Sequence, residues 1–456
     1  MNNPVKQPEV KVILRRAALF FGRMVVFSIA LAVGWAGGAI VLTGIAPDSV
    51  IGAAVAQGQS GNKRKTVRTP TMRESIYKKL ASAQEDLEKK DYASAMSTLN
   101  ALKADKGLNC YEIVQTWNVI AYVYVTQEQY DKALPAYNNV LKQECVPEGI
   151  EQQTLYAISQ MYLATDKPKE AIKTLKRWFA ISTPNPQAYV MLGQCYYLVD
   201  DFKSSVVQVE KGIALNKEHG AEPRETWLLI LRAGYYELGN SKKVTEVLEE
   251  LVRLYPKGEY LQQLSGMYGE QGKDIRQTLV LEASYDGGYF KKSGEYVALT
   301  SLLLNAEVPY KAAKVMEEGI KKKIVDEKIN NLKMLAQSYL MAQEPRESIR
   351  VLKKAAKMSN DGELYIRLGQ SYMNLDEWTA CVGAIKSGLK KGGIKRVDSA
   401  EVSLGICLYN TDNLDDAISA FKRAAKDERS KKFSASWIEF LRSEKARRQA
   451  IEASLI

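Results

Sequence analysis

One pattern recurs ten times along this chain and limits what the chain can fold into. In each copy, a small side chain is followed at a fixed distance by large apolar residues, and the next counterpart comes 33 to 39 residues later. The ten positions are Ala95, Ala133, Ala171, Ser205, Val244, Gln277, Ala312, Ser348, Cys381 and Ala417. A spacing of about 35 residues suits a supersecondary unit rather than a domain, so the pattern predicts a repeat architecture.

Each copy has the residue spacing of two short helices joined by a turn. In the clearest copy, Trp117, Ala121 and Tyr124 precede the turn, and Ala133 and Tyr137 follow it. Apolar residues three and four apart indicate helices, and one small residue per helix lets the two helices approach closely. Helices of three or four turns cannot bury such faces alone, so neighbouring copies must stack.

The pattern therefore predicts an all-α, right-handed superhelical solenoid of about ten helix-turn-helix repeats over residues 71–428. The end of the stack needs a cover, and residues 429–456 read as one more helix. Trp437, Phe440 and Leu441 lie on one predicted face of it and charged residues on the other. We interpret this helix as a solubilising cap.

The ten copies resemble the tetratricopeptide repeat, whose period is about 34 residues. Copies two, four, nine and ten match its signature well, whereas copies one, six and seven are degenerate. In copy six, Gln277 and Leu281 are weak substitutes, and Gly287 and Gly288 follow them. The resemblance implies that the chain binds proteins along a groove lined by the first helix of each repeat.

Carried over by position, that rule places a set of uncharged residues at two equivalent levels of the groove. Gln160, Gln194, Gln337 and Gln370 share the first level with Tyr122; Tyr197, Tyr236 and Met373 share the second with Leu163 and Leu340. An amide both donates and accepts hydrogen bonds, so such a ladder could hold the backbone of an extended ligand. The alternative is that glutamine is simply a good residue for a solvated helix.

The N-terminus predicts export. Basic residues up to Arg23 precede an uncharged run over residues 24–47, and Ala54-Val55-Ala56 forms a small-residue cleavage site. Residues 1–56 are therefore a signal peptide or, because the apolar run could span a bilayer, an anchor in the inner membrane facing the periplasm. Residues 57–70 are polar and basic and predict a flexible linker.

Five cysteines lie in the exported part: Cys110, Cys145, Cys195, Cys381 and Cys407. Cys110 precedes the first helix of copy two and Cys145 follows its second helix, so a disulfide between them is sterically reasonable. Two free thiols is the interpretation we favour, because connectivity is not readable from sequence. The other three occupy helix-packing positions, which predicts small buried apolar residues.

The residues required for catalysis or for a metal site do not come together. His219 is the one histidine, so a His-based triad or a two-His metal site cannot be built within one chain. Phosphate-loop and nucleophile-elbow motifs are missing from the sequence. We therefore expect no enzyme activity, no cofactor and no metal. The net charge of +11 comes from interspersed charges without a recognised motif, so we also expect no nucleic-acid partner.

Beyond the repeat itself, six segments resemble one subfamily, the exported repeat proteins assigned to the TonB system of Gram-negative bacteria. The segments are TMRES (71–75), ADKGLN (104–109), QTLY (153–156), GMYG (266–269), VPYKAA (308–313) and DGELY (361–365). The resemblance implies a periplasmic adaptor near TonB, ExbB and ExbD. Two alternatives stay open: a scaffold for other envelope machinery, such as polysaccharide export or outer-membrane assembly, and a noncatalytic subunit that activates an enzyme.

Overall fold

The computed structural model describes residues 71–454, and every regular element in this part of the chain is a helix. The predicted export segment (1–56) and linker (57–70) lie outside the described residues. The described residues separate into two compact units, one ending at Tyr255 and the other beginning at Pro256. Within the described residues, no helix is both long and apolar enough to cross a membrane.

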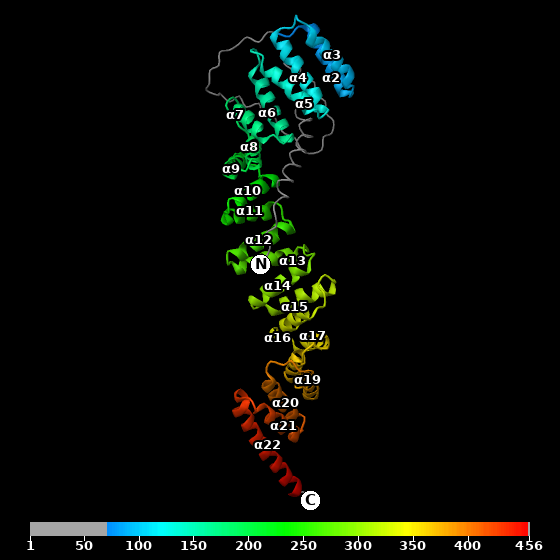
Figure 1. Ribbon diagram of the computed structural model, residues 1–456, viewed down its shortest axis with the longest axis vertical. Coiled ribbons are helices and arrows are strands. Elements are labelled where there is room, and N and C mark those ends of the chain that lie inside the picture. The colour runs from blue at the N-terminus through cyan, green and yellow to red at the C-terminus, as the bar shows by residue number, and fades with distance from the viewer. Residues whose placement is uncertain (1–70, 455–456) are drawn as a thin grey trace. The chain divides into compact units, whose positions relative to one another are not determined.

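The first unit contains five helical hairpins that follow one another in chain order (Figure 1). They are α2 (Glu74–Glu88) with α3 (Tyr92–Ala104), α4 (Cys110–Thr126) with α5 (Tyr130–Leu141), α6 (Glu148–Ala164) with α7 (Pro168–Phe179), α8 (Pro186–Leu198) with α9 (Phe202–Glu218), and α10 (Glu225–Glu237) with α11 (Ser241–Leu254).

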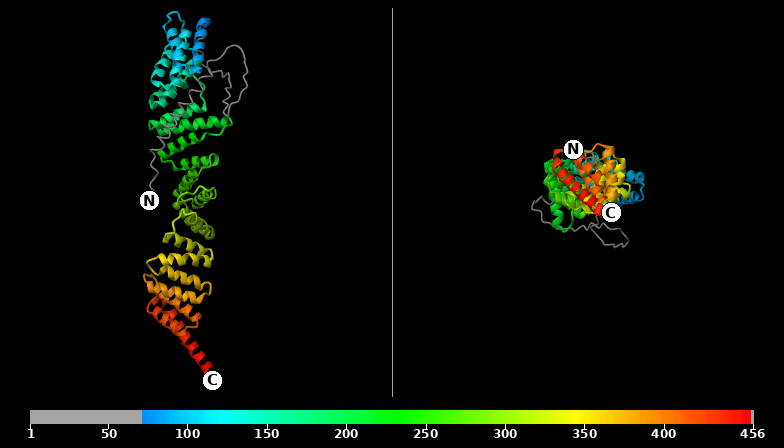
Figure 2. Two further views of the ribbon diagram at one scale, coloured as in Figure 1. Left: turned by 90° about the vertical axis from the view of Figure 1, so that its right-hand side faces the viewer. Right: turned by 90° about the horizontal axis from the view of Figure 1, so that it is seen from below.

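The second unit contains five more hairpins and a longer last helix (Figures 1 and 2). The hairpins are α12 (Gly258–Glu270) with α13 (Asp274–Asp286), α14 (Ser293–Asn305) with α15 (Pro309–Lys321), α16 (Ile329–Met341) with α17 (Pro345–Met358), α18 (Glu363–Met373) with α19 (Trp378–Lys391), and α20 (Val397–Asn410) with α21 (Leu414–Ala424). The last helix is α22 (Glu428–Ser454), which packs on α20 and α21.

The predicted all-α repeat fold is confirmed in the described residues. All ten positions of the sequence pattern fall in the second helix of a hairpin, and nine of the ten side chains are buried. In most hairpins, the residue twelve positions earlier is a small or short side chain buried in the first helix, such as Ala121 opposite Ala133 or Gly405 opposite Ala417. Pairs of small residues thus set the close approach of the two helices.

Gln277 is the exception among the ten, and the structure shows how the hairpin accommodates it. A Cβ atom added to Gly269 in α12 would lie 2.6 Å from the Gln277 amide nitrogen, so glycine at 269 gives this larger side chain its space in the conformation that it adopts here. In this hairpin α13 has the large Gln277 where the other second helices have a smaller residue, and α12 has the small Gly269 facing it. The sixth copy, although degenerate in sequence, therefore still forms a hairpin, because Gly269 accommodates Gln277.

The turn of every hairpin repeats the same backbone conformation. Five residues before each of the ten positions, a residue has a positive φ between 56° and 67°. These residues are Lys90, Glu128, Asp166, Asp200, Gly239, Gly272, Glu307, Gln343, Asp376 and Asp412. The next amide then donates to a carbonyl five residues back, as Gln129 does to Tyr124 at 2.8 Å. This bond satisfies a free helix-end carbonyl, and eight of the ten turns form it without glycine at the left-handed residue.

Candidate functional site

The predicted groove residues all lie on first helices of hairpins. In the unit that ends at Tyr255, Tyr122 lies on α4, Gln160 on α6, Gln194 and Tyr197 on α8, and Tyr236 on α10. In the unit that begins at Pro256, Gln337 lies on α16, and Gln370 and Met373 lie on α18. The sequence register therefore placed these residues on the intended helices, and their exposure decides which of them can contact a partner.

In the first unit, the middle of the predicted ladder is not accessible. Gln194 is 6% exposed and Tyr197 is 1% exposed, so their assignment to an exposed binding surface is wrong. The Tyr197 ring packs edge-on against Phe202 of α9 at a centroid distance of 5.2 Å, and burial raises its pKa to about 12. Tyr236 remains 43% exposed, whereas Tyr122 is half-buried. Gln160 is half-buried as well.

In the second unit, the predicted glutamines are at the surface. Gln337 and Gln370 are both exposed, and they lie on the first helices of successive hairpins. Met341, one turn beyond Gln337, is 46% exposed. Its sulfur lies 3.9 Å from the side-chain amide nitrogen of Gln337. Met373 is half-buried one turn beyond Gln370. An amide with a flexible thioether beside it offers both hydrogen bonds and apolar contact.

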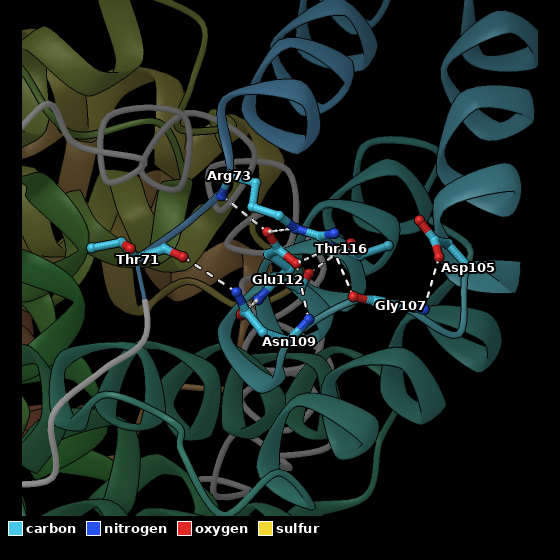
Figure 3. A network of polar contacts seen from close by, with 7 residues as sticks. All are labelled: Thr71, Arg73, Asp105, Gly107, Asn109, Glu112 and Thr116. Atoms are coloured by element: carbon cyan, nitrogen blue, oxygen red, sulfur yellow. Dashed lines mark hydrogen bonds and ion pairs between the residues drawn. The ribbon is translucent and has the colours of Figure 1, made fainter.

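A polar clasp closes the N-terminal end of the first unit (Figure 3). The Arg73 guanidinium donates to both carboxylate oxygens of Glu112, at 2.9 and 2.7 Å, and to the carbonyl of Gly107 at 2.8 Å. The backbone amides of Arg73 and Asn109 also donate to this carboxylate. The Asn109 side chain in turn donates to the carbonyl of Thr71 and caps α4. The start of α2 is thereby fixed to the start of α4.

The Glu112 carboxylate is fully buried, and it stays charged because of these donors. Its hydrogen bond with Arg73 is the main cause that lowers its pKa to about 2, against the effect of burial. Burying a carboxylate is tolerated only when its oxygens are paired in this way. Two of the segments that resemble the TonB-linked subfamily, 71–75 and 104–109, supply Arg73, Gly107 and Asn109 to the clasp. Those residues therefore have a structural role here.

The cysteines form two disulfides in the described residues. Cys110 is bonded to Cys145 within the second hairpin, with their Cα atoms 6.1 Å apart, so our preference for free thiols at these positions is wrong. Cys381 is bonded to Cys407, and this pair joins α19 to α20. Cys381 and Cys407 are buried as predicted, and they are also bonded, because α19 and α20 pack against each other. Cys195 is a buried free thiol whose pKa burial raises to about 12.

At the C-terminal end, α22 is held by small residues and one aromatic stack. Ser430 donates to Asp398 at 2.7 Å, and the hydrogen bond from Arg396 is the main cause that lowers the pKa of Asp398. Trp437 stacks on the buried ring of Phe421, with centroids 5.2 Å apart and planes 14° from parallel. These contacts anchor the first half of the helix on α20 and α21.

The same helix carries an aromatic hollow that sequence reasoning missed. It has a volume of about 670 Å³, and it is lined by Arg429, Lys432, Phe433, Ser436, Trp437 and Phe440. Phe440 is 47% exposed, so its predicted place on the packing face of a solubilising cap is wrong. The spacing of 433, 437 and 440 is the signal that could have revealed it, since i, i+4 and i+7 share one side of a helix.

In the described part of the chain, no group of three or more His, Cys, Asp or Glu side chains is placed to hold a metal ion. The arrangements found there are clasps, disulfides and aromatic clusters. Each of them can position helices or contact a partner.

Comparison with known proteins identifies one hairpin directly. Residues 114–144, which run from α4 past the end of α5, match the model of the tetratricopeptide repeat. The second hairpin is therefore a tetratricopeptide repeat, and the ten-fold pattern repeats its geometry.

Two curated proteins share part of the sequence. The BBSome complex member BBS4 homolog of Drosophila melanogaster is 24% identical over 136 residues, which is 30% of this chain and 27% of that protein. The DnaJ homolog subfamily C member 3 of Mus musculus is 23% identical over 211 residues, which is 46% of this chain and 37% of that protein. The chain thus spans well under half of the length of either relative.

Solved structures show local likeness only. The crystal structure of MamA protein is 22% identical, covers 38% of this chain and 91% of that chain, and has a TM-score of 0.33. The TPR2AB domain of yeast Sti1 in its pHSP90 complex is 16% identical, covers 58% of this chain and 99% of that chain, and has a TM-score of 0.33. At these TM-scores the likeness carries no functional information.

Proposed function

We propose that this chain is an exported scaffold that binds other proteins and performs no chemistry of its own. The observation that carries the proposal is the exposed pair Gln337 and Gln370, which repeats one uncharged surface position on successive first helices. A periodic array of this kind suits an extended ligand, because a stack of repeats presents equivalent positions along its length. The tetratricopeptide match at 114–144 supports the same class of function.

The proposed partners are components of the TonB system in the periplasm. Support comes from the six segments that resemble the TonB-linked repeat proteins and from the signal-like N-terminus. Since residues 71–75 and 104–109 build the clasp, the remaining segments carry more weight for binding. Val308 and Tyr310, in the segment 308–313, are 43% and 53% exposed. The scaffold would organise TonB, ExbB or ExbD without hydrolysing anything.

Cross-linking in intact envelopes tests the partner directly. The tagged full-length chain is cross-linked in its own cells, and mass spectrometry identifies the captured proteins. Enrichment of TonB-, ExbB- or ExbD-like proteins supports the proposal, and their loss in a Gln337→Ala/Gln370→Ala variant assigns binding to the exposed glutamines. A Gln187→Ala variant, which removes an exposed amide outside both the ladder and the six segments, serves as the matched control. Enrichment of polysaccharide-export or outer-membrane-assembly proteins instead would replace the TonB assignment.

Export is tested separately with alkaline phosphatase fused after residue 70. The enzyme folds only where disulfides form, so activity in whole cells indicates that the chain leaves the cytoplasm. The two disulfides of this chain predict the same compartment. An inactive fusion would contradict the periplasmic assignment.

A further inference from the structure

The last helix has an apolar edge that its packing does not use. Ser430, Ser434 and Leu441 are buried against the preceding hairpin and form the packing side of α22. Phe433 and Phe440 lie on another side and are 50% and 47% exposed. A helix that only covered the end of a repeat stack would carry polar residues there, so these phenylalanines call for another explanation.

The exposed rings are held in fixed positions around one anchored indole. Trp437, which stacks on Phe421, lies 6.3 Å from the ring of Phe433 and 5.8 Å from that of Phe440. Tyr409 of α20 meets both Trp437 and Phe440 edge-on, at 5.5 and 5.7 Å. Rings that are already fixed lose little conformational entropy when a ligand binds, which favours affinity.

Tyr409 ties this surface to the predicted groove. It lies four residues after Gly405, just as Met373 lies four residues after Gly369 and Tyr197 four after Gly193. Tyr409 does not line the hollow itself, but its ring contacts two of the lining residues, so the hollow lies beside this first-helix level.

The two charged residues that line the hollow are both cationic. Arg429 and Lys432 line it, and none of its lining residues is acidic. Arg429 is paired with Asp427, whereas Lys432 is exposed and forms no ion pair in the described residues. From residue 256 onward the chain has 33 cationic and 27 anionic residues, while residues 71–255 have 22 and 24. The two lining cations and the excess of cationic residues in this unit favour an anionic ligand.

We propose that the aromatic hollow on α22 binds a segment of another protein in which large apolar side chains are flanked by carboxylates. The apolar side chains insert between Phe433, Trp437 and Phe440, and the carboxylates meet Lys432 and Arg429 at the rim. The inference rests on the proposed scaffold function, and it adds the chemistry of one partner and the place where that partner binds.

Fluorescence anisotropy with defined peptides tests the inference on the full-length chain. One labelled peptide of 12 residues carries a Trp-Leu centre flanked by Asp and Glu, and its control carries Asn and Gln in their place. We expect saturable binding of the acidic peptide and about tenfold weaker binding of the neutral one. We also expect the acidic peptide to weaken as salt rises, because exposed charges are screened. Equal binding of both peptides, or no saturable binding, would overturn the proposal.

Variants locate the site. Lys432→Glu should weaken the acidic peptide about tenfold, and Phe433→Ser/Phe440→Ser should abolish measurable binding. Arg442→Glu is the matched control, because Arg442 is an exposed cation on the face of α22 opposite to the two phenylalanines. An equal effect of Arg442→Glu and Lys432→Glu would reject the hollow as the site.

Two further outcomes are distinguishable. If sedimentation shows wild-type dimers that Phe433→Ser/Phe440→Ser dissolves, a second copy occupies the hollow and the proposal is wrong. If the acidic peptide binds at the hollow but no TonB-system protein is captured in cells, the partner assignment fails while this site stands. If TonB-system proteins are captured in a way that depends on Gln337 and Gln370 but the acidic peptide does not bind at the hollow, the proposed function stands and the hollow is rejected as a binding site.

Discussion

The two ends of the described chain are closed by similar anchors but leave different surfaces. At the N-terminal end, Arg73 holds the buried carboxylate of Glu112 and ties α2 to α4. At the C-terminal end, Arg396 and Ser430 hold the buried carboxylate of Asp398 and tie α22 to α20. Both ends thus use a buried, fully paired carboxylate. The C-terminal end adds a cluster of neighbouring rings, Phe433, Trp437 and Phe440, whereas the exposed ring on the N-terminal helix α2 is that of Tyr77.

The largest expected effect concerns the disulfide next to the C-terminal end. Cys381 and Cys407 close a loop with a sequence separation of 26 residues. Replacing both by alanine should lower the free energy of unfolding of the unit that begins at Pro256 by about 3–4 kcal/mol, because the unfolded chain gains entropy. Denaturant titration with and without the substitutions measures the difference. An unchanged midpoint would show that stacking alone fixes α19 on α20.

The two disulfides should also differ in access. Cys110 and Cys145 are half-buried, whereas Cys381 and Cys407 are fully buried. Mild reductant followed by alkylation and mass spectrometry should label the first pair well before the second. Equal labelling rates would indicate that the C-terminal hairpins open as easily as the second hairpin.

The next effect concerns the aromatic anchor of α22. Trp437→Ala removes the stack on Phe421 and should cost about 3 kcal/mol. The helix would then detach, and limited proteolysis should cut near its start in the variant and not in the wild type. Phe433→Ser/Phe440→Ser is the matched control, since these rings are half-exposed and their loss should cost much less. Equal destabilisation would mean that the exposed rings stabilise the fold.

The N-terminal clasp predicts a pH-dependent effect of about 2 kcal/mol at neutral pH for Glu112→Gln, because a charge-assisted buried network is lost. Folding lowers the pKa of Glu112 from 4.5 to about 2. Its stabilising contribution is therefore complete above pH 4.5 and disappears as the pH falls through about 2. Urea titrations across this range should show that the wild type and Glu112→Gln converge in acid. A constant difference down to pH 2 would contradict the clasp.

The smallest effect compares the turns at the two ends. Lys90 and Asp412 both have positive φ, of 60° and 62°. Lys90→Gly should stabilise the first unit by about 0.5–1 kcal/mol, because glycine adopts this conformation without steric cost. Asp412→Gly should gain less, since Asp412 also pairs with Arg448 of α22. Thermal unfolding of both variants measures the difference, and a larger gain at Asp412 would show that this ion pair contributes nothing.

Much of the fold could be predicted because the repeat geometry is local. Small residues twelve positions apart, as in Ala121 and Ala133, must oppose each other in a hairpin of fixed turn length. The compensation of Gln277 by Gly269 could not be predicted in this way, since Gly269 lies eight rather than twelve positions before Gln277. Likewise, the Cys381–Cys407 bond depends on which faces of neighbouring hairpins meet.

The candidate site was predicted less well because exposure is a property of the whole stack. Gln194 and Gln337 hold the same sequence position, yet the first is buried and the second is exposed. Phe440 was assigned to the packing face with Trp437 and Leu441, because every terminal helix needs an apolar face. The buried serines Ser430 and Ser434 supply part of that face instead, so Phe433 and Phe440 remain about half exposed.

The most direct test measures stability and binding on one pair of variants. The account predicts that Phe433→Ser/Phe440→Ser keeps nearly wild-type free energy of unfolding but loses the acidic peptide. It predicts that Glu112→Gln is destabilised but binds this peptide with wild-type affinity. Peptide binding retained by the phenylalanine variant, or lost in Glu112→Gln while that variant stays folded, would contradict the claim that the C-terminal end is a binding surface.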